Sequence, residues 1–309
     1  MNPISDEPRT AATRVDQAGE AVGTSRATVV DIHPHVISDD DVSYPRAPLF
    51  GKQSTWSQER PVTVEAMIAA MDDAGVDKAA VVQSSTCYGF DNSYVADACA
   101  RFPDRLAAIG SVDMVQPDAP DRIREWVDRG VVGLRLFTGG STNAFDASLL
   151  DDPRTFPSWA LCGDLGLSMC IQTNPAGLAQ VAGLARRFPG VRIVLDHLGR
   201  PDVSDGPPYL KAASLFALAP LGNVYLKLTP RIFVDAAQSP ASPETFFPRL
   251  VEAFGADRLA WGSNFPASSG TMAANLVIAR AGLQTLTAAD RAWIFGKTAQ
   301  VLYPPLADA

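Results

Sequence analysis

The chain has 309 residues and a formal net charge of −8, with 26 Lys and Arg residues against 34 Asp and Glu residues. This acidity excludes the basic surface that nonspecific nucleic-acid binding requires. Hydrophobic residues make up 47% and charged residues 19% of the chain, as in globular proteins that bury a large core. We therefore expect a small molecule as the partner, with no nucleic acid and no membrane, and the sequence leaves a homo-oligomer open.

The first 27 residues contain no apolar run that could serve as a signal-peptide core or a membrane span. We expect residues 1–27 to form a flexible N-terminal tail before one folded domain at 28–309, in a cytoplasmic protein. No Cys-x-x-Cys spacing occurs among the four cysteines. They are expected to be free, buried thiols.

From residue 28 onward, short β-branched segments alternate with amphipathic ones. The predicted strands are 28–36, 78–84, 106–112, 131–137, 168–173, 192–198, 223–229 and 259–263. The predicted helices are 62–74, 92–102, 119–129, 156–165, 177–188, 209–219, 243–254 and 287–302. Such alternation implies right-handed crossovers and a parallel sheet, and eight units predict an α/β protein with a single (β/α)8 TIM barrel. The alternative, an open doubly wound sheet, lacks the Gly-x-Gly-x-x-Gly turn after its first strand.

The first predicted strand contains two of the three histidines, His33 and His35. Side chains alternate along a strand, so Asp31 would share one face with both of them. The third histidine, His197, follows the sixth strand. Catalytic residues of barrels lie at the carboxyl ends of strands, and all three histidines fall there. They could bind a metal or polarise a carbonyl group.

Basic and polar side chains gather at the other predicted strand ends. Guanidinium groups bind carboxylates bidentately, so this set predicts an anionic substrate. The alternative for the strand cations is structural pairing with Asp31 or Asp196. Arg46 lies in the long first loop, which is expected to shape the pocket. The predicted substrate-binding residues are Arg135, Lys227, Arg231, Tyr88, Gln172 and Arg46.

Several motifs in this order resemble the amidohydrolase superfamily, in the branch that includes 2-pyrone-4,6-dicarboxylate lactonase, sugar lactonases and galactarolactone isomerase. They are Asp31-Ile32-His33-Pro34-His35, Val82-Gln83-Ser84 with Tyr88-Gly89-Phe90-Asp91-Asn92, Gly133-Leu134-Arg135-Leu136, Asp196-His197-Leu198-Gly199-Arg200-Pro201, Asn223-Val224-Tyr225-Leu226-Lys227-Leu228 and Trp261-Gly262-Ser263-Asn264-Phe265-Pro266. The resemblance implies a hydrolase that opens a small carboxylated lactone by attack of water on the carbonyl carbon. His33, His35 and His197 would polarise the carbonyl or stabilise the oxyanion, and Asn264 would position water or a hydroxyl group.

Two departures from the family pattern concern metals. Metal-dependent members supply a histidine from strand five, where this chain has Gln172, and two-metal members use a lysine on strand four, where it has Arg135. A binuclear site is therefore not expected. We expect no required cofactor; the alternative is one Zn²⁺ or Mn²⁺ held by His33, His35 and His197.

A third departure is Asn264, because family hydrolases carry an aspartate there that takes a proton from the attacking water. An amide cannot accept that proton at neutral pH. Asp31 or His197 could act as the base instead, or Asn264 could be an engineered replacement. A lactone isomerase, in which a substrate hydroxyl opens the ring, is the first alternative function. A metal-dependent decarboxylase and a ligand-binding barrel without catalysis are the others.

Overall fold

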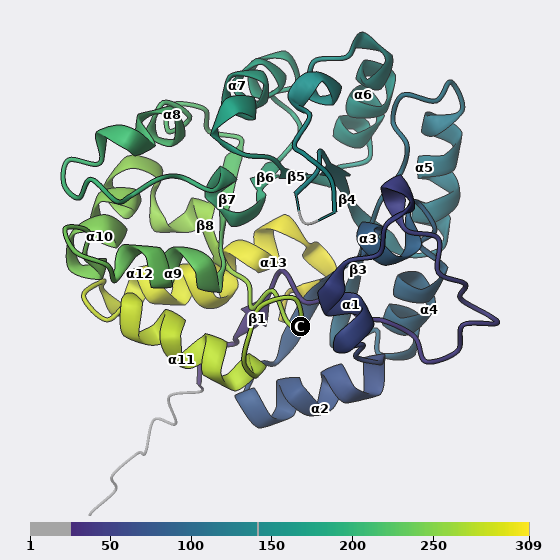
Figure 1. Cartoon of the computed structure of the whole chain (residues 1–309), viewed down its shortest axis with the longest axis horizontal. Coiled ribbons are helices and arrows are strands. Elements are labelled where there is room, and N and C mark those ends of the chain that lie inside the picture. Colours follow the sequence, from purple (N-terminus) through teal and green to yellow (C-terminus); the bar gives the residue numbers. More distant parts are fainter. Residues whose placement is uncertain (1–25, 141, 309) are drawn as a thin grey trace, which may run out of the picture.

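The computed structural model describes residues 26–140 and 142–308, and its centre is one sheet of eight parallel strands in sequential order (Figure 1). The first and last strands are joined by a hydrogen bond from the N–H of Ile32 to the carbonyl oxygen of Trp261, at 3.1 Å. The predicted (β/α)8 barrel is confirmed. The strands are β1 Val30–Asp31, β2 Lys78–Val82, β3 Leu106–Gly110, β4 Val131–Phe137, β5 Ser168–Gln172, β6 Ile193–Leu195, β7 Val224–Leu228 and β8 Leu259–Trp261. Residues 1–25 of the predicted tail lie outside the described residues.

Helices surround the strands on all sides (Figure 1). They are α1 Thr55–Glu59, α2 Val64–Ala74, α3 Ser85–Tyr88, α4 Ser93–Arg101, α5 Ala119–Asp128, α6 Phe156–Asp164, α7 Leu178–Arg187, α8 Ala213–Phe216, α9 Pro230–Ala236, α10 Pro243–Phe254, α11 Met272–Gly282, α12 Ala288–Ala292 and α13 Thr298–Leu302. A π-helical segment, Trp293–Lys297, joins α12 to α13 where the sequence predicted one helix. The sequence did not predict α1, α3, α9 or α11. Of the predicted helix 209–219, only α8 and a 3-10 turn form.

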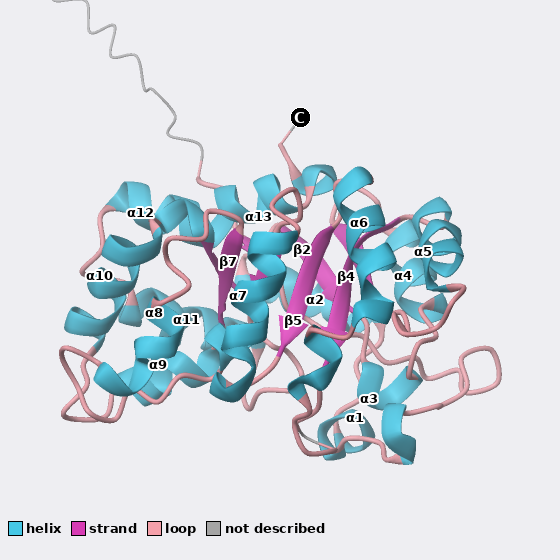
Figure 2. Ribbon diagram, turned by 90° about the horizontal axis from the view of Figure 1, so that it is seen from above, coloured by secondary structure: helices cyan, strands magenta, loops and turns pink. Residues whose placement is uncertain are grey.

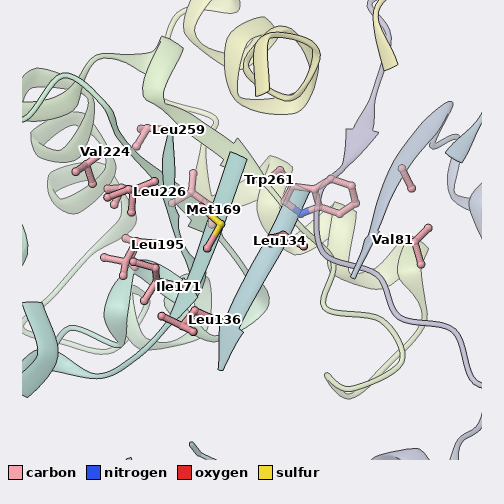
Figure 3. Close-up of a cluster of buried hydrophobic side chains, with 14 of the residues drawn as sticks. Val81, Leu134, Leu136, Met169, Ile171, Leu195, Val224, Leu226, Leu259 and Trp261 are labelled. Carbon is pink, nitrogen blue, oxygen red and sulfur yellow. The ribbon is translucent and has the colours of Figure 1, made fainter. Parts of the chain in front are cut away.

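The strands bury both faces. Figure 3 shows the outward side chains, including Leu134, Met169, Leu226 and Trp261, which pack into the layer beneath the helices. The inward side chains form a second apolar cluster with the C-terminal segment, including Tyr303. Ser168 anchors that segment, because its hydroxyl donates to the Leu302 carbonyl at 2.8 Å. In Figure 2 the C-terminus lies at one end of the barrel, and α1 and α3 lie at the other.

The first strand is shorter than predicted, and this changes which side chains share a face. Val30 and Ile32 pack in the inner cluster, so Asp31 between them points to the outer layer, like its register partner Ala79. The chain bends at Ile32, and His33 then turns into the barrel. The prediction that Asp31 shares a face with His33 is therefore wrong, because strand alternation ends at the bend.

All four cysteines are free and buried, as predicted. Within residues 26–140 and 142–308, no helix is both long and apolar enough to cross a membrane.

Candidate active site

Three histidine rings, here called the histidine cluster (His33, His35 and His197), meet at the carboxyl end of the barrel. The centroid of the His33 ring lies 5.0 Å from that of His35 and 4.9 Å from that of His197, with the planes nearly perpendicular. The backbone around His33 is held by Asp31, whose Oδ1 accepts the N–H groups of His33 and Ser263, both at 2.9 Å. Asp31 therefore holds the backbone next to the histidine cluster in position.

Each of the two outer histidines is oriented by a hydrogen bond at its Nδ1 atom. Nδ1 of His35 lies 2.7 Å from the carbonyl oxygen of Val82, and Nδ1 of His197 lies 2.7 Å from Oγ1 of Thr229. Burial lowers the pKa of His35 to about 4 and that of His197 to about 3. Both rings are therefore neutral at pH 7 and can donate at one nitrogen and accept at the other.

A buried network of charges lies beneath the histidine cluster. Oδ2 of Asp196 accepts from Nε of Arg135 at 2.8 Å, and Oδ1 lies 3.0 Å from Nζ of Lys227. Burial raises the pKa of Asp196, but the charges of Lys227 and Arg135 outweigh this and hold it well below its ordinary value. Nη2 of Arg135 donates to the side-chain oxygen of Gln172 at 2.5 Å. The network contains two cations and one anion, so it carries an excess positive charge.

A cavity of about 200 Å³ opens above the histidine cluster. Among the described residues, its lining contains basic, hydroxyl, amide and aromatic groups, but no carboxylate. The lining residues are His35, Trp56, Ser84, Ser85, Thr86, Arg135, Phe137, Gln172, His197, Arg200, Asn264 and Ala267. Five of the predicted site residues thus line the cavity, namely His35, His197, Asn264, Arg135 and Gln172, and His33 contacts two of them from below.

Arg200 is a lining residue that the sequence did not predict as part of the site. Its guanidinium lies 5.0 Å from the centroid of the Phe145 ring, and its Nε is buried without a hydrogen-bond partner among the described residues. Burial, with the charges of Arg231 and Arg135, lowers its pKa below the ordinary value. The only signal in the sequence was a basic residue three positions after His197. Arg200 gives the cavity a second guanidinium beside Arg135.

Asn264 lines the cavity and lies three residues after the end of β8. Its backbone has a φ of 50°, in the left-handed region that asparagine tolerates better than most residues. Its Nδ2 donates to Oγ of Ser268 at 2.9 Å. The amide orientation is therefore fixed from outside the cavity.

Two predicted substrate-binding residues, Arg46 and Tyr88, do not line the cavity. The Tyr88 hydroxyl accepts the N–H of Ser38 at 2.8 Å and Nη1 of Arg46 at 3.1 Å. Arg46 also donates to the Ser38 carbonyl at 2.6 Å and pairs with Asp41 at 2.7 Å. The prediction that Arg46 and Tyr88 bind the substrate is therefore corrected. Both side chains stabilise the long first loop, and their polar groups form hydrogen bonds within it.

The other two predicted binding residues, Lys227 and Arg231, also lie outside the lining. Lys227 is completely buried beneath the histidine cluster, where its ammonium has two protein partners. Arg231 lies on α9 and pairs with Asp235 at 3.2 Å, with its side chain 62% exposed. It borders a neighbouring hollow that also includes Arg200. Arg231 can therefore reach only a substrate group that extends out of the cavity.

The histidine cluster does not fit a divalent metal ion well. Nζ of Lys227 lies 3.0 Å from Nδ1 of His33. Asp196, whose Oδ1 lies 3.7 Å from Nδ1 of His33, is already paired with Arg135 and Lys227. Gln172 and Asn264, which line the cavity beside the histidines, carry neutral amides in place of an imidazole or a carboxylate. Within the described residues, no group of three or more His, Cys, Asp or Glu side chains is arranged to hold a metal ion.

Comparison with known proteins assigns this chain to a family. The profile of a family described as amidohydrolase matches residues 30–304. L-fucono-1,5-lactonase from Burkholderia ambifaria is 30% identical over 213 residues, covering 67% of this chain and 70% of that protein. 2-Pyrone-4,6-dicarboxylate hydrolase from Comamonas testosteroni is 26% identical over 258 residues, covering 78% and 77%. The chain belongs to the amidohydrolase family, as the sequence motifs predicted.

Solved structures share the fold. A crystal structure of an amidohydrolase from Burkholderia multivorans with bound zinc superposes with a TM-score of 0.74 at 21% identity, covering 90% of this chain and 99% of that one. At this identity the likeness concerns the barrel alone. The zinc is a property of that protein, and its relevance to this chain depends on the residues described above.

Proposed function

We propose that this protein hydrolyses the ring ester bond of a small lactone that carries a carboxylate. The observation that carries the proposal is a small cavity lined by Arg135 and Arg200 together with neutral His35 and His197, with no carboxylate among the described lining residues. The two guanidinium groups suit an anionic substrate. The relatives described above, a lactonase and a hydrolase of a pyrone dicarboxylate, support both the ester bond and the carboxylate.

The groups of the cavity can serve the steps of ester hydrolysis. The oxygen of water adds to the carbonyl carbon while the water gives up a proton, for which Nε2 of His35 is an acceptor in the cavity. The bond between that carbon and the ring oxygen then breaks, and the ring oxygen takes up this proton to give an open-chain hydroxy acid. His197 supplies an N–H donor for the developing oxyanion from Nε2 when its Nδ1 accepts from the Thr229 hydroxyl. His35, whose Nδ1–H donates to the Val82 carbonyl, instead offers the lone pair of its Nε2. Asn264 in the cavity lining can orient the water by hydrogen bonding. Arg135 and Arg200 hold the carboxylate and so fix the ring in the cavity.

We propose further that this reaction needs no divalent metal. The support is the chemistry of the donor set: an ammonium contacts His33, and an amide side chain stands at both Gln172 and Asn264. The activity should accordingly survive treatment of the protein with a chelator.

The experiment is a comparison of carboxylated and neutral lactones of equal ring size, with products identified by NMR. We expect the open-chain hydroxy acid, a higher kcat/KM for the carboxylated lactones and no loss after chelation. His197→Gln, which removes one cavity histidine, serves as the inactive reference. A lactone with a migrated ring as the only product would establish an isomerase instead. Failure of every lactone to react, or loss of activity with zinc removal and its return with zinc, would overturn the proposal.

A further inference from the structure

Lys227 is a fully buried lysine inside the barrel, and its ammonium has two partners there. Nζ lies 3.0 Å from Oδ1 of Asp196 and 3.0 Å from Nδ1 of His33. An ammonium has three N–H donors and no lone pair, so in this contact Nδ1 of His33 must accept. The proton of the His33 ring is therefore on Nε2.

The neighbouring histidine has the opposite arrangement. Nδ1 of His35 lies 2.7 Å from the carbonyl oxygen of Val82, which can only accept, so this ring carries its proton on Nδ1 and has a lone pair on Nε2. The two ring centroids are 5.0 Å apart. The pair thus offers one N–H donor, from His33, next to one acceptor, from His35. Nε2 of His33 is buried and has no partner among the described residues, so its donor is not used within the protein.

We propose that Lys227 is a positioning residue that fixes His33 as the Nε2–H tautomer and thereby keeps a divalent metal ion out of the histidine cluster. A metal binds an imidazole nitrogen through its lone pair, and the only lone pair of His33 faces the ammonium. The positive charge of Lys227 also repels a second cation at this distance, in a site that is shielded from water. The inference does not depend on which ester is hydrolysed.

The tautomer can be measured directly on the wild-type protein. The chain has only three histidines, so selective ¹⁵N-histidine labelling gives three rings to assign, with His33→Gln identifying one of them. We expect the proton of His33 on Nε2 and that of His35 on Nδ1. A proton on Nδ1 of His33, or protons on both of its nitrogens at neutral pH, would overturn the proposal.

The metal exclusion is tested by titrating zinc alone into wild type and Lys227→Met, without substrate. Removing a buried unit charge next to the site should tighten zinc binding by about a hundredfold or more, and zinc should then shift the ¹⁵N signals of the histidine cluster. Lys227→Arg should resemble wild type, because a guanidinium also only donates and keeps the charge. Lys78→Met is the matched control, since Lys78 begins β2 and contacts the Ala307 carbonyl near the C-terminus.

Equal zinc affinity in wild type and folded Lys227→Met would contradict the proposal. If circular dichroism shows that Lys227→Met does not fold, the proposal is tested by the His33 tautomer in the wild type and by the ¹⁵N spectra of Lys227→Arg. A purely structural role for Lys227 would lower the thermal stability without moving the proton between the nitrogens of His33. These measurements use no lactone, so their failure is distinguishable from failure of the proposed hydrolysis.

Discussion

Gly262 and His33 lie so close together that a Cβ atom added to Gly262 would be 2.6 Å from the Cβ of His33. Gly262 follows β8 and His33 follows β1, so this contact lies at the seam where the barrel closes. Only a residue without a side chain permits the approach. The glycine in the Trp-Gly-Ser-Asn motif therefore allows the first histidine to enter the barrel.

The first prediction is that Gly262→Ala displaces His33. The added methyl group should destabilise the fold by about 1–3 kcal/mol, as overpacking of a dense interior does, and should lower kcat more than it changes KM. Denaturant unfolding and steady-state kinetics measure both effects. Gly183→Ala is the control, because a Cβ there meets nothing within 4 Å and α7 should gain stability. A Gly262→Ala variant with wild-type stability and rate would contradict the prediction, because the backbone between β1 and β8 would then move apart without cost.

The second prediction concerns stability in acid. His35 has a pKa of about 4 in the fold against an ordinary value of 6.5, so the unfolded chain binds more protons between these two values. The free energy of unfolding should accordingly fall as the pH drops from 6.5 towards 4, with a slope of up to about 1.4 kcal/mol per pH unit from this group. Urea unfolding at several pH values gives the slope. His35→Gln should make it shallower.

Asp31 changes the pH dependence of the free energy of unfolding in the opposite direction to His35. Burial raises its pKa to about 6 despite hydrogen bonds from Ser263 and the His33 backbone. The folded protein therefore binds more protons at this group between pH 4 and 6, and Asp31 favours folding towards acid pH. Asp31→Asn should steepen the acid loss of stability. An unchanged slope in both variants would mean that neither buried group titrates differently from the unfolded chain.

The barrel and three strand-end histidines could be predicted from the sequence, because parallel topology alone brings the carboxyl ends of strands together. Arg200 could not. After β6, residues His197, Leu198 and Arg200 all have a positive φ, between 54° and 57°, and this irregular turn brings Arg200 to the cavity lining. Side-chain partners could be predicted only in part. Pairing of the strand cations with Asp196 was one of the two alternatives, and Arg135 and Lys227 both make it. Nothing in the sequence shows that a loop backbone uses the Tyr88 hydroxyl.

The third prediction is that Arg200→Ala weakens turnover of carboxylated lactones far more than that of neutral ones. Arg200 has no charged partner among the described residues, so its guanidinium is available to a substrate anion. Losing a charge-assisted hydrogen bond costs about 1.5–3 kcal/mol, or roughly ten- to a hundredfold in kcat/KM. Arg231→Ala is the matched control, since Arg231 is exposed and pairs with Asp235. Equal losses on charged and neutral substrates would assign Arg200 a structural role.

The last prediction concerns Asn264, which lines a cavity with no carboxylate in the part of the chain that the structure describes. Replacing it with aspartate keeps its size and adds a group that is ionised at neutral pH, since the ordinary pKa of an aspartate is near 4. The Ser268 hydroxyl, which now accepts from the amide, can rotate and donate to the new carboxylate. The variant should therefore hydrolyse its lactone faster by about 10²-fold, the scale of general-base catalysis. Rates and product ratios for wild type and Asn264→Asp on one lactone provide the test. An unchanged or lower rate in a folded variant would mean that another group, such as the free Nε2 of His35, already accepts the proton. Adding His35→Gln to both proteins would then separate the two bases, because only a protein that depends on His35 should lose its remaining hydrolysis.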